Sequence, residues 1–242
     1  MRVCGPAATI APGGPVFYRS RVKRTETPRV KVCCIASLEE ARRAVAAGAD
    51  AIGLVSEMPS GPGVIDEGRI ADIAAAVPAG VETWLLTSRQ SALDIVDQHG
   101  QVRTTGIQIV DELAPGAYQV LRGLLPGVRL VQVVHVTGPE SFDEAVVVAP
   151  LVDALLLDSG SRRLPIKELG GTGRVHDWSI SRRIREAVEA PVWLAGGLRP
   201  GNVVSALEEV GPFGLDVCTG VRVNGRLDSP TLEAFMRAAG RD

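Results

Sequence analysis

The sequence predicts a closed (β/α)8 barrel that forms a single domain. Short apolar runs alternate with amphipathic stretches until eight strand–helix pairs are complete, and the 242 residues match the ~250 that such a barrel typically needs. No hairpin signal separates the runs, which indicates parallel strands. An open, doubly wound sheet is the alternative. We disfavour it because the first and last runs are as apolar as the middle ones, whereas an open sheet usually exposes its edge strands.

Each expected strand is rich in Val, Leu, Ile and Ala, and aromatic residues are only 4% of the chain. This composition is typical of parallel strands that are buried on both faces. The expected strands are 30–35, 51–56, 81–87, 106–110, 129–135, 154–158, 191–195 and 214–218. The helices that follow them are expected at 38–47, 66–76, 90–99, 115–124, 141–148, 177–188, 200–209 and 229–239. Ser37 and Asp177 are expected to cap the first and sixth helices, because their side-chain oxygens accept from free backbone N–H groups. The second helix is expected to open with Asp66.

Residues 1–29 differ from the rest of the chain. They are rich in Gly, Pro and Arg and lack any helical or strand periodicity. We interpret them as a flexible N-terminal arm that precedes a barrel of residues 30–242. A segment that contacts a second copy in a homodimer and a translation start placed too early are the alternatives.

Composition excludes several classes of partner. The 26 basic and 28 acidic residues nearly balance, so no basic excess indicates binding to nucleic acid. No apolar run approaches the ~18 residues of a membrane span, and no signal peptide is expected. Four cysteines in a chain of this length do not indicate a secreted disulfide framework. We therefore expect reduced thiols and a cytoplasmic protein.

A thiol and a carboxyl stand at the ends of two predicted strands, where barrels of this class place their active sites. Asp158 ends a wholly apolar strand, where burying a carboxylate without a partner is costly, and this favours a functional acid. Cys33 shares strand parity with Lys31, whose ammonium would favour the thiolate. Cys34 should point the other way, among the surrounding helices, and we interpret both Cys34 and Cys218 as packing residues. Opposite orientations of Cys33 and Cys34 disfavour a shared metal, and no metal is expected.

Glycine-rich turns follow the last three predicted strands. Glycine lets backbone N–H groups approach an anion closely, and such clusters bind phosphate oxygens without a charged side chain. The usual phosphate site of the barrel class lies after strands seven and eight. The sequence therefore predicts a phosphorylated small-molecule substrate. The turns are Gly170-Gly171-Thr172-Gly173, Gly196-Gly197 and Thr219-Gly220.

Together these residues resemble the phosphoribosylanthranilate isomerase family over nearly all of residues 30–242. The family's first strand reads K-[IV]-C-G-[IL], and here the strand is Lys31-Val32-Cys33-Cys34-Ile35. Leu157-Asp158-Ser159 resembles the family's sixth strand. The remaining motifs, in the family's order, are Ala47-Gly48-Ala49-Asp50-Ala51, Gly170-Gly171-Thr172-Gly173 with Asp177-Trp178, Leu194-Ala195-Gly196-Gly197-Leu198, and Gly214-Leu215-Asp216-Val217.

The resemblance implies a sugar-phosphate isomerase of tryptophan biosynthesis that needs no cofactor. The family catalyses an Amadori rearrangement of an aminoaldose phosphate to an aminoketose phosphate. Asp158 would be the general acid that opens the ribose ring, and Cys33 the general base that removes the C2 proton. The expected substrate-binding residues are Lys31, Gln108, Gly171, Thr172, Gly173, Gly196, Gly197, Thr219 and Gly220.

Three positions depart from the family. Cys34 replaces the glycine of the first strand. Gly63 stands where the family has an arginine that meets the anthranilate carboxylate, and Val110 replaces a histidine. A paralogous isomerase with another phosphorylated substrate, and a non-catalytic phosphometabolite-binding barrel, therefore remain alternatives. The candidates for a replacement cation are Arg89, Arg162 and Arg163.

Overall fold

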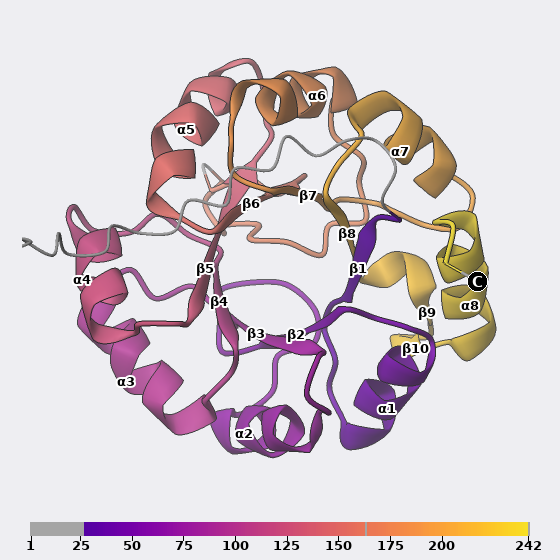
Figure 1. The fold of residues 1–242 in the computed structure, drawn as a ribbon, viewed down its shortest axis with the longest axis horizontal. Coiled ribbons are helices and arrows are strands. Elements are labelled where there is room, and N and C mark those ends of the chain that lie inside the picture. The colour runs from indigo at the N-terminus through magenta and orange to yellow at the C-terminus, as the bar shows by residue number, and fades with distance from the viewer. Residues whose placement is uncertain (1–26, 163, 242) are drawn as a thin grey trace, which may run out of the picture.

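The computed structural model describes residues 27–162 and 164–241. Eight parallel strands close into a barrel in the order β1 to β8, and helices surround it (Figure 1). The prediction of a (β/α)8 barrel is thus confirmed. The strands are β1 (Arg29–Val32), β2 (Ala51–Val55), β3 (Glu82–Thr87), β4 (Gly106–Ile109), β5 (Arg129–His135), β6 (Ala154–Asp158), β7 (Val192–Leu194) and β8 (Gly214–Val217). The predicted N-terminal arm lies outside the described residues, except for 27–29.

The helices lie within a few residues of their predicted ranges. They are α1 (Leu38–Ala46), α2 (Glu67–Ala76), α3 (Ala92–Val102), α4 (Ala117–Leu124), α5 (Glu140–Val148), α6 (Trp178–Ala187), α7 (Val203–Val210) and α8 (Ser229–Ala238). The side chains of Ser37 and Asp177 accept hydrogen bonds from first-turn N–H groups, so these two predicted caps are confirmed. Asp66, with which the second helix was expected to open, is its N-cap. A two-residue hairpin of β9 (Arg222–Val223) and β10 (Arg226–Leu227), which the sequence analysis did not predict, precedes α8.

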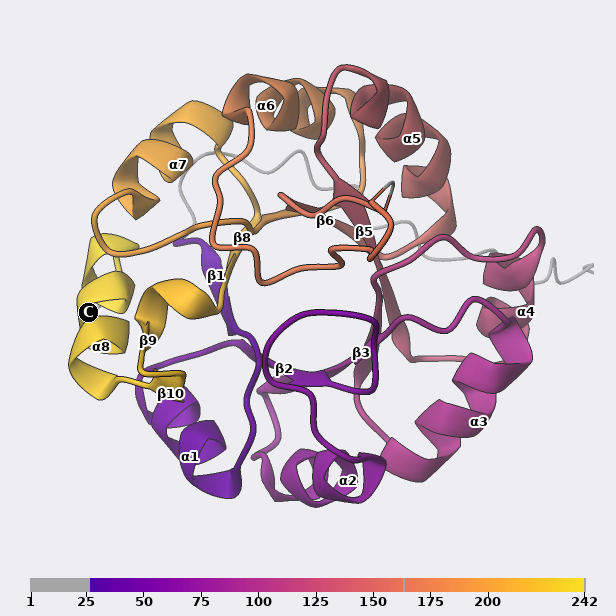
Figure 2. The same ribbon diagram turned by 180° about the vertical axis from the view of Figure 1, so that it is seen from behind.

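Closure of the barrel sets residues of β1 beside residues of β8. The parallel register pairs Lys31 with Asp216 and Val32 with Val217. Figure 2 shows the opposite face of the barrel, where the loops after β2 and β6 lie over the mouth. Because parallel strands share one direction, all eight deliver their carboxyl ends to this mouth.

Two apolar layers form the core. The larger lies between the strands and the helices and is mainly aliphatic, as predicted. The inner layer fills the barrel and also contains Trp84 and Trp193, whose ring centroids lie 5.0 Å apart in an edge-to-face arrangement. Two indoles therefore provide much of the volume beneath the mouth. No helix in the described ranges is long and apolar enough to cross a membrane.

Candidate active site

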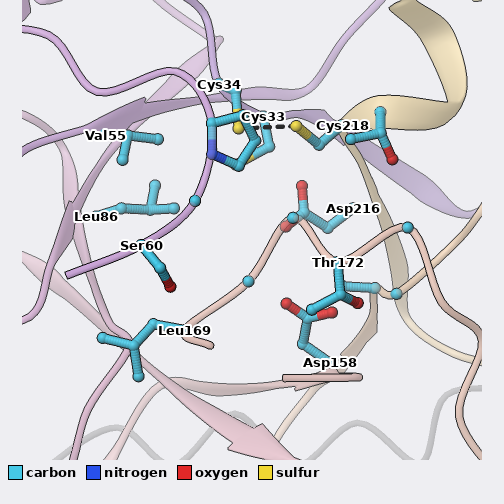
Figure 3. Close-up of a pocket in the computed structure, with 18 of the residues that line it drawn as sticks. Cys33, Cys34, Val55, Ser60, Leu86, Asp158, Leu169, Thr172, Asp216 and Cys218 are labelled. Carbon is cyan, nitrogen blue, oxygen red and sulfur yellow. Dashed lines mark hydrogen bonds between the residues drawn. The ribbon is translucent and has the colours of Figure 1, made fainter. Parts of the chain in front are cut away.

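One pocket opens over the carboxyl ends of the strands. Figure 3 shows Cys33, Asp158, Asp216 and Thr172 facing this space from different strands and loops. Most of the predicted site residues line it. Those residues are Cys33, Gln108, Asp158, Gly171, Thr172, Gly173, Gly196, Gly197 and Thr219. The mouth thus collects groups that are far apart in the sequence.

Two predicted residues do not line the pocket. Lys31 is fully buried beneath it, and its Nζ lies 2.8 Å from Asp216 Oδ2 and 5.4 Å from the centroid of a Trp84 ring. Gly220 packs against the turn after β7, because a Cβ at this position would lie 1.9 Å from the carbonyl oxygen of Leu198. Both residues therefore support the pocket from behind.

Asp216 also lines the pocket, although the sequence indicated no role for it beyond its place in a motif. Its Oδ2 accepts from Lys31, whereas its Oδ1 is buried and has no hydrogen-bond partner. Burial raises the pKa of Asp216, although the Lys31 ammonium opposes this shift. Burial alone would lower the pKa of Lys31, but the Asp216 carboxylate and the Cys33 thiol outweigh it and the pKa is raised. The signal that could have identified Asp216 is its pairing with Lys31 in the parallel register of β1 and β8.

Cys33 lies close to this ion pair. A Cβ on Gly53 would lie 2.7 Å from Cys33 Sγ and 3.1 Å from Lys31 Nζ, so both atoms occupy the space that this glycine leaves free. The pKa of Cys33 is lowered, chiefly by a hydrogen bond from the Cys34 thiol; burial opposes the shift and the Lys31 ammonium supports it. The site therefore favours the thiolate of Cys33.

The predicted orientation of Cys34 is wrong. Strand β1 ends at Val32, and Cys34 has a left-handed backbone with φ of 60°, so the alternation of a strand does not extend to it. Cys34 lines the pocket beside Cys33, and its Sγ accepts a hydrogen bond from Cys218 Sγ at 2.8 Å. Cys218 also lines the pocket and is not a packing residue alone. Glycine at this position of the family motif was a signal for positive φ.

Two of the departures from the family motif contact each other. A Cβ on Gly63 would lie 2.6 Å from the Cβ and 3.0 Å from the Cα of Cys34. Gly63 also has φ of +78°, which disfavours any other residue. The Cys34 side chain therefore fills the space that a glycine at residue 34 would leave free. It fits there because Gly63 has no side chain.

We predict that Gly63→Ala destabilises the protein and that Cys34→Gly relieves part of the loss. The single variant should lose about 2–4 kcal/mol, since it combines overpacking with a left-handed backbone. In the double variant the two changes should couple by about 1 kcal/mol. Urea unfolding measures both values. Gly225→Ala is the control, because its φ of +76° is similar but a Cβ there meets nothing within 4 Å. Equal losses for Gly63→Ala and Gly225→Ala would contradict the contact.

Asp158 ends β6 at the predicted position and is 8% exposed. Its Oδ1 accepts from the backbone N–H of Ser159 at 2.7 Å. Burial raises the pKa of Asp158, and the hydrogen bond from Ser159 and the charge of Lys31 oppose this shift. A Cβ on Gly170 would lie 3.2 Å from Asp158 Oδ2, so the loop after β6 passes directly over the carboxyl. A carboxyl in this setting can hold a proton at a higher pH than an exposed one.

The predicted glycine turns meet at one side of the pocket. A Cβ on Gly197 would lie 2.9 Å from the carbonyl oxygen of Gly173, and a Cβ on Gly173 would lie 3.6 Å from Thr219 Oγ1. The hydroxyl of Thr172 shares a 2.6 Å hydrogen bond with that of Ser159. The three glycine turns therefore pack together at this side of the pocket, and their binding of a phosphate through backbone N–H groups stays a prediction.

The opposite side of the pocket is apolar. Val55, Leu86 and Leu169 line it, and the buried Oε1 of Gln108 has no hydrogen-bond partner. Among the described residues, no group of three or more His, Cys, Asp or Glu side chains could hold a metal ion. This side can therefore pack a flat apolar group against a single amide.

The cations proposed from the sequence are engaged elsewhere or not described. Arg89 pairs with Glu67 at 2.9 Å, Arg162 pairs with Glu144, and Arg163 lies outside the described residues. Lys167, which the sequence analysis did not consider, contacts both segments that have lost a family residue. Its carbonyl oxygen accepts from Ser60 in the loop after β2, and its ammonium lies 2.5 Å from Asp111 at the end of β4.

The loop after β2 and the loop after β6, which contain Ser60 and Lys167, are also in contact above the pocket. A Cβ on Gly171 would lie 2.3 Å from Pro62 Cδ, so these residues are in close contact. The loops after β2 and β6 therefore form a roof over the strand ends, as Figure 2 shows.

Fold and pocket together define a (β/α)8-barrel enzyme with a small-molecule site at the carboxyl ends of its strands. Residues 30–238 match the family model described as N-(5'-phosphoribosyl)anthranilate (PRA) isomerase. The chain belongs to this family.

Curated relatives and solved structures agree with this assignment. The N-(5'-phosphoribosyl)anthranilate isomerase of Haloferax volcanii is 38% identical over 87% of this chain and 92% of its own. That of Methanocella arvoryzae is 34% identical over 82% and 91%. The crystal structure of the Thermotoga maritima enzyme has a TM-score of 0.76 and 27% identity, covering 88% of this chain and 98% of its own. A phosphoribosyl anthranilate isomerase at 26% identity was solved with reduced 1-(o-carboxyphenylamino)-1-deoxyribulose 5-phosphate.

Proposed function

We propose that this protein is a phosphoribosylanthranilate isomerase of tryptophan biosynthesis that acts in the cytoplasm. One observation carries the proposal: Cys33 and Asp158 line the same pocket beside the glycine turns. A mere phosphate binder needs no such acid–base pair. Family membership supports the substrate, an anthranilate joined through nitrogen to a ribose 5-phosphate.

The reaction divides between the two side chains. Asp158, protonated, donates to the ribose ring oxygen, and the bond from that oxygen to C1 breaks as the nitrogen lone pair forms a Schiff base. Cys33, as thiolate, removes the C2 proton, and the electrons of that C–H bond form an enolamine. Tautomerisation of the enolamine gives the ketone. Both steps are general acid–base catalysis and require no cofactor.

Substrate binding divides along the pocket. We infer that the phosphate binds at the glycine turns, because Gly171, Thr172, Gly173, Gly196, Gly197 and Thr219 line the same pocket. Gly220 supports that turn, and Lys31 holds Asp216 at the ribose. The aromatic ring is placed on the apolar side near Gln108.

Turnover of freshly generated phosphoribosylanthranilate by the purified protein tests the proposal. Turnover that Cys33→Ala and Asp158→Ala both abolish would support it. Absence of turnover in a protein that still binds a ribose-phosphate analogue would overturn it in favour of a changed substrate or a binding barrel.

The assembly state is a separate proposal. A related enzyme of Thermotoga maritima is dimeric. We propose that this protein also forms a homodimer, and sedimentation velocity of the full chain tests it.

We predict that Cys33 reacts with iodoacetamide faster than an ordinary thiol near neutral pH. The lowered pKa of Cys33 makes thiolate available at lower pH, so the midpoint of its alkylation should fall below the usual thiol value of 9.0. Mass spectrometry of each cysteine against pH measures it. Cys34 is the internal control, because hydrogen bonds with Cys218 and Cys33 raise its pKa. A midpoint for Cys33 at or above that of Cys34 would argue against Cys33 as the base.

We predict that Lys167, which pairs with Asp111 and does not itself line the pocket, supplies the charge opposite the anthranilate carboxylate. An ammonium has three donors, so Lys167 can keep Asp111 and bind a second carboxylate. Lys167→Met should raise KM about tenfold and leave kcat nearly unchanged. The matched comparison is the phosphoribosyl derivative of aniline, which lacks the carboxylate. Lys167→Met should leave the KM of this substrate unchanged. An equal rise of KM for both substrates would refute the assignment.

A further inference from the structure

Two thiols in the pocket have no part in the proposed reaction. Cys34 lies just beyond β1 and Cys218 just beyond β8, which are neighbours in the closed barrel. Cys218 Sγ donates to Cys34 Sγ at 2.8 Å, the dashed line in Figure 3. Both are free thiols, and both line the pocket, so a small reagent that enters the pocket can reach them.

The backbone at Cys34 is in a conformation that suits glycine. A left-handed backbone is unfavourable for any other residue, because the Cβ crowds the following carbonyl oxygen. Such strain tends to persist where a side chain has a task that offsets it. Here the strained backbone places the Cys34 sulfur beside that of Cys218, with Gly63 providing the room.

We propose that Cys34 and Cys218 form a dithiol that a peroxide oxidises to a disulfide within the pocket. Closing the bond requires the sulfurs to move from 2.8 Å to about 2.05 Å. The sulfur of Cys218 attacks one peroxide oxygen and the O–O bond breaks. The Cys218 thiol proton passes to the leaving oxygen, so Cys218 sulfenic acid forms and water or an alcohol is released. Cys34 sulfur then attacks the Cys218 sulfur, the S–O bond breaks, and the hydroxyl leaves with the Cys34 proton as water. Two thiols lose two electrons, and the peroxide is reduced.

The disulfide would act on the neighbouring groups. Cys34 would lose the S–H that donates to Cys33, and Cys218 is followed directly by Thr219 of the glycine turns. Oxidation should therefore stop isomerisation until a dithiol reductant restores the pair. This effect on activity rests on the proposed function, whereas formation of the disulfide does not.

Peptide mapping after treatment with hydrogen peroxide tests the proposal. The reduced full-length protein is treated, free thiols are blocked with N-ethylmaleimide, and tryptic peptides are sequenced by mass spectrometry. We expect a crosslink between the peptide of Cys34 and that of Cys218, with loss of two hydrogen atoms and reversal by dithiothreitol. Cys34→Gly, which installs the family's residue, and Cys218→Ser should form none.

Two results would overturn the proposal. One is oxidation of Cys33 alone to sulfinic acid with Cys34 and Cys218 still blocked by maleimide. The other is a crosslink to Cys218 that persists in Cys34→Gly, which would assign the bond to Cys33. Activity is followed in parallel, each variant against its own untreated sample, and should fall in step with the crosslinked fraction. A crosslink in a protein with no turnover at all would leave the dithiol standing and the proposed function refuted.

Discussion

Replacing Asp158 by asparagine should lower kcat for phosphoribosylanthranilate by about 10²- to 10⁴-fold, the usual contribution of a general acid. Asparagine keeps the size of the side chain and an oxygen that can accept from Ser159 N–H, but it has no acidic proton. Cys33→Ala should have a similar effect, because it removes the base from the same reaction. Steady-state kinetics measures both.

The pH profile separates these roles from a loss of structure. The proposed mechanism uses Asp158 protonated and Cys33 ionised, so the wild-type profile should be bell-shaped. Burial raises the pKa of Asp158, which keeps the acid form present at higher pH than an exposed aspartate would. In Asp158→Asn only the Cys33 titration remains, and residual activity should rise with pH and then level.

Asp177→Asn is the matched control for this experiment. Asp177 caps α6 away from the pocket lining, and asparagine caps a helix about as well as aspartate, so its kcat should stay at the wild-type level. If Asp158→Asn retained more than a tenth of wild-type kcat, another group would have to be the acid.

Lys31→Met should lower the free energy of unfolding by about 3–5 kcal/mol, because it leaves a buried carboxyl without its partner. Lys31 is 0% and Asp216 is 8% exposed, and the other oxygen of Asp216 already has no partner. Urea unfolding at neutral pH measures the loss. Lys31→Met combined with Asp216→Asn should recover part of it, since the unpaired charge is then removed.

A surface ion pair provides the control. Arg182 and Glu186 lie 3.0 Å apart on α6, and both side chains are about half exposed. Arg182→Met should cost less than about 1 kcal/mol. If Lys31→Met also lowered the free energy of unfolding by less than about 1 kcal/mol, Asp216 would be solvated or protonated in the folded protein.

Repetition made the fold readable from the sequence. Each apolar run and the amphipathic stretch after it are local signals, and eight such pairs in series leave few alternatives to a barrel. Asp158 could be placed because it ends its strand as the pattern requires. The error at Cys34 has a local cause: strand alternation was extended past Val32, where the backbone turns left-handed.

Other residues could not be placed because their contacts are not local. Lys167 sits in an irregular loop, and only the folded chain brings it to Asp111 and Ser60. The contact of Gly63 with Cys34 likewise joins two loops. Asp216 was readable in principle, but its meaning depends on β8 lying beside β1 in register with Lys31.

The contact of Pro62 with Gly171 has a consequence for the traffic of molecules through the site. In the proposed binding mode, a substrate that carries a phosphate at one end and an aromatic acid at the other lies beneath both loops. Separation of the two loops would then widen its path into and out of the site. Arrival and departure would then be paced by this separation and not by diffusion alone. The same contact would retain the open-chain intermediate, which water could otherwise intercept, until the ketone has formed.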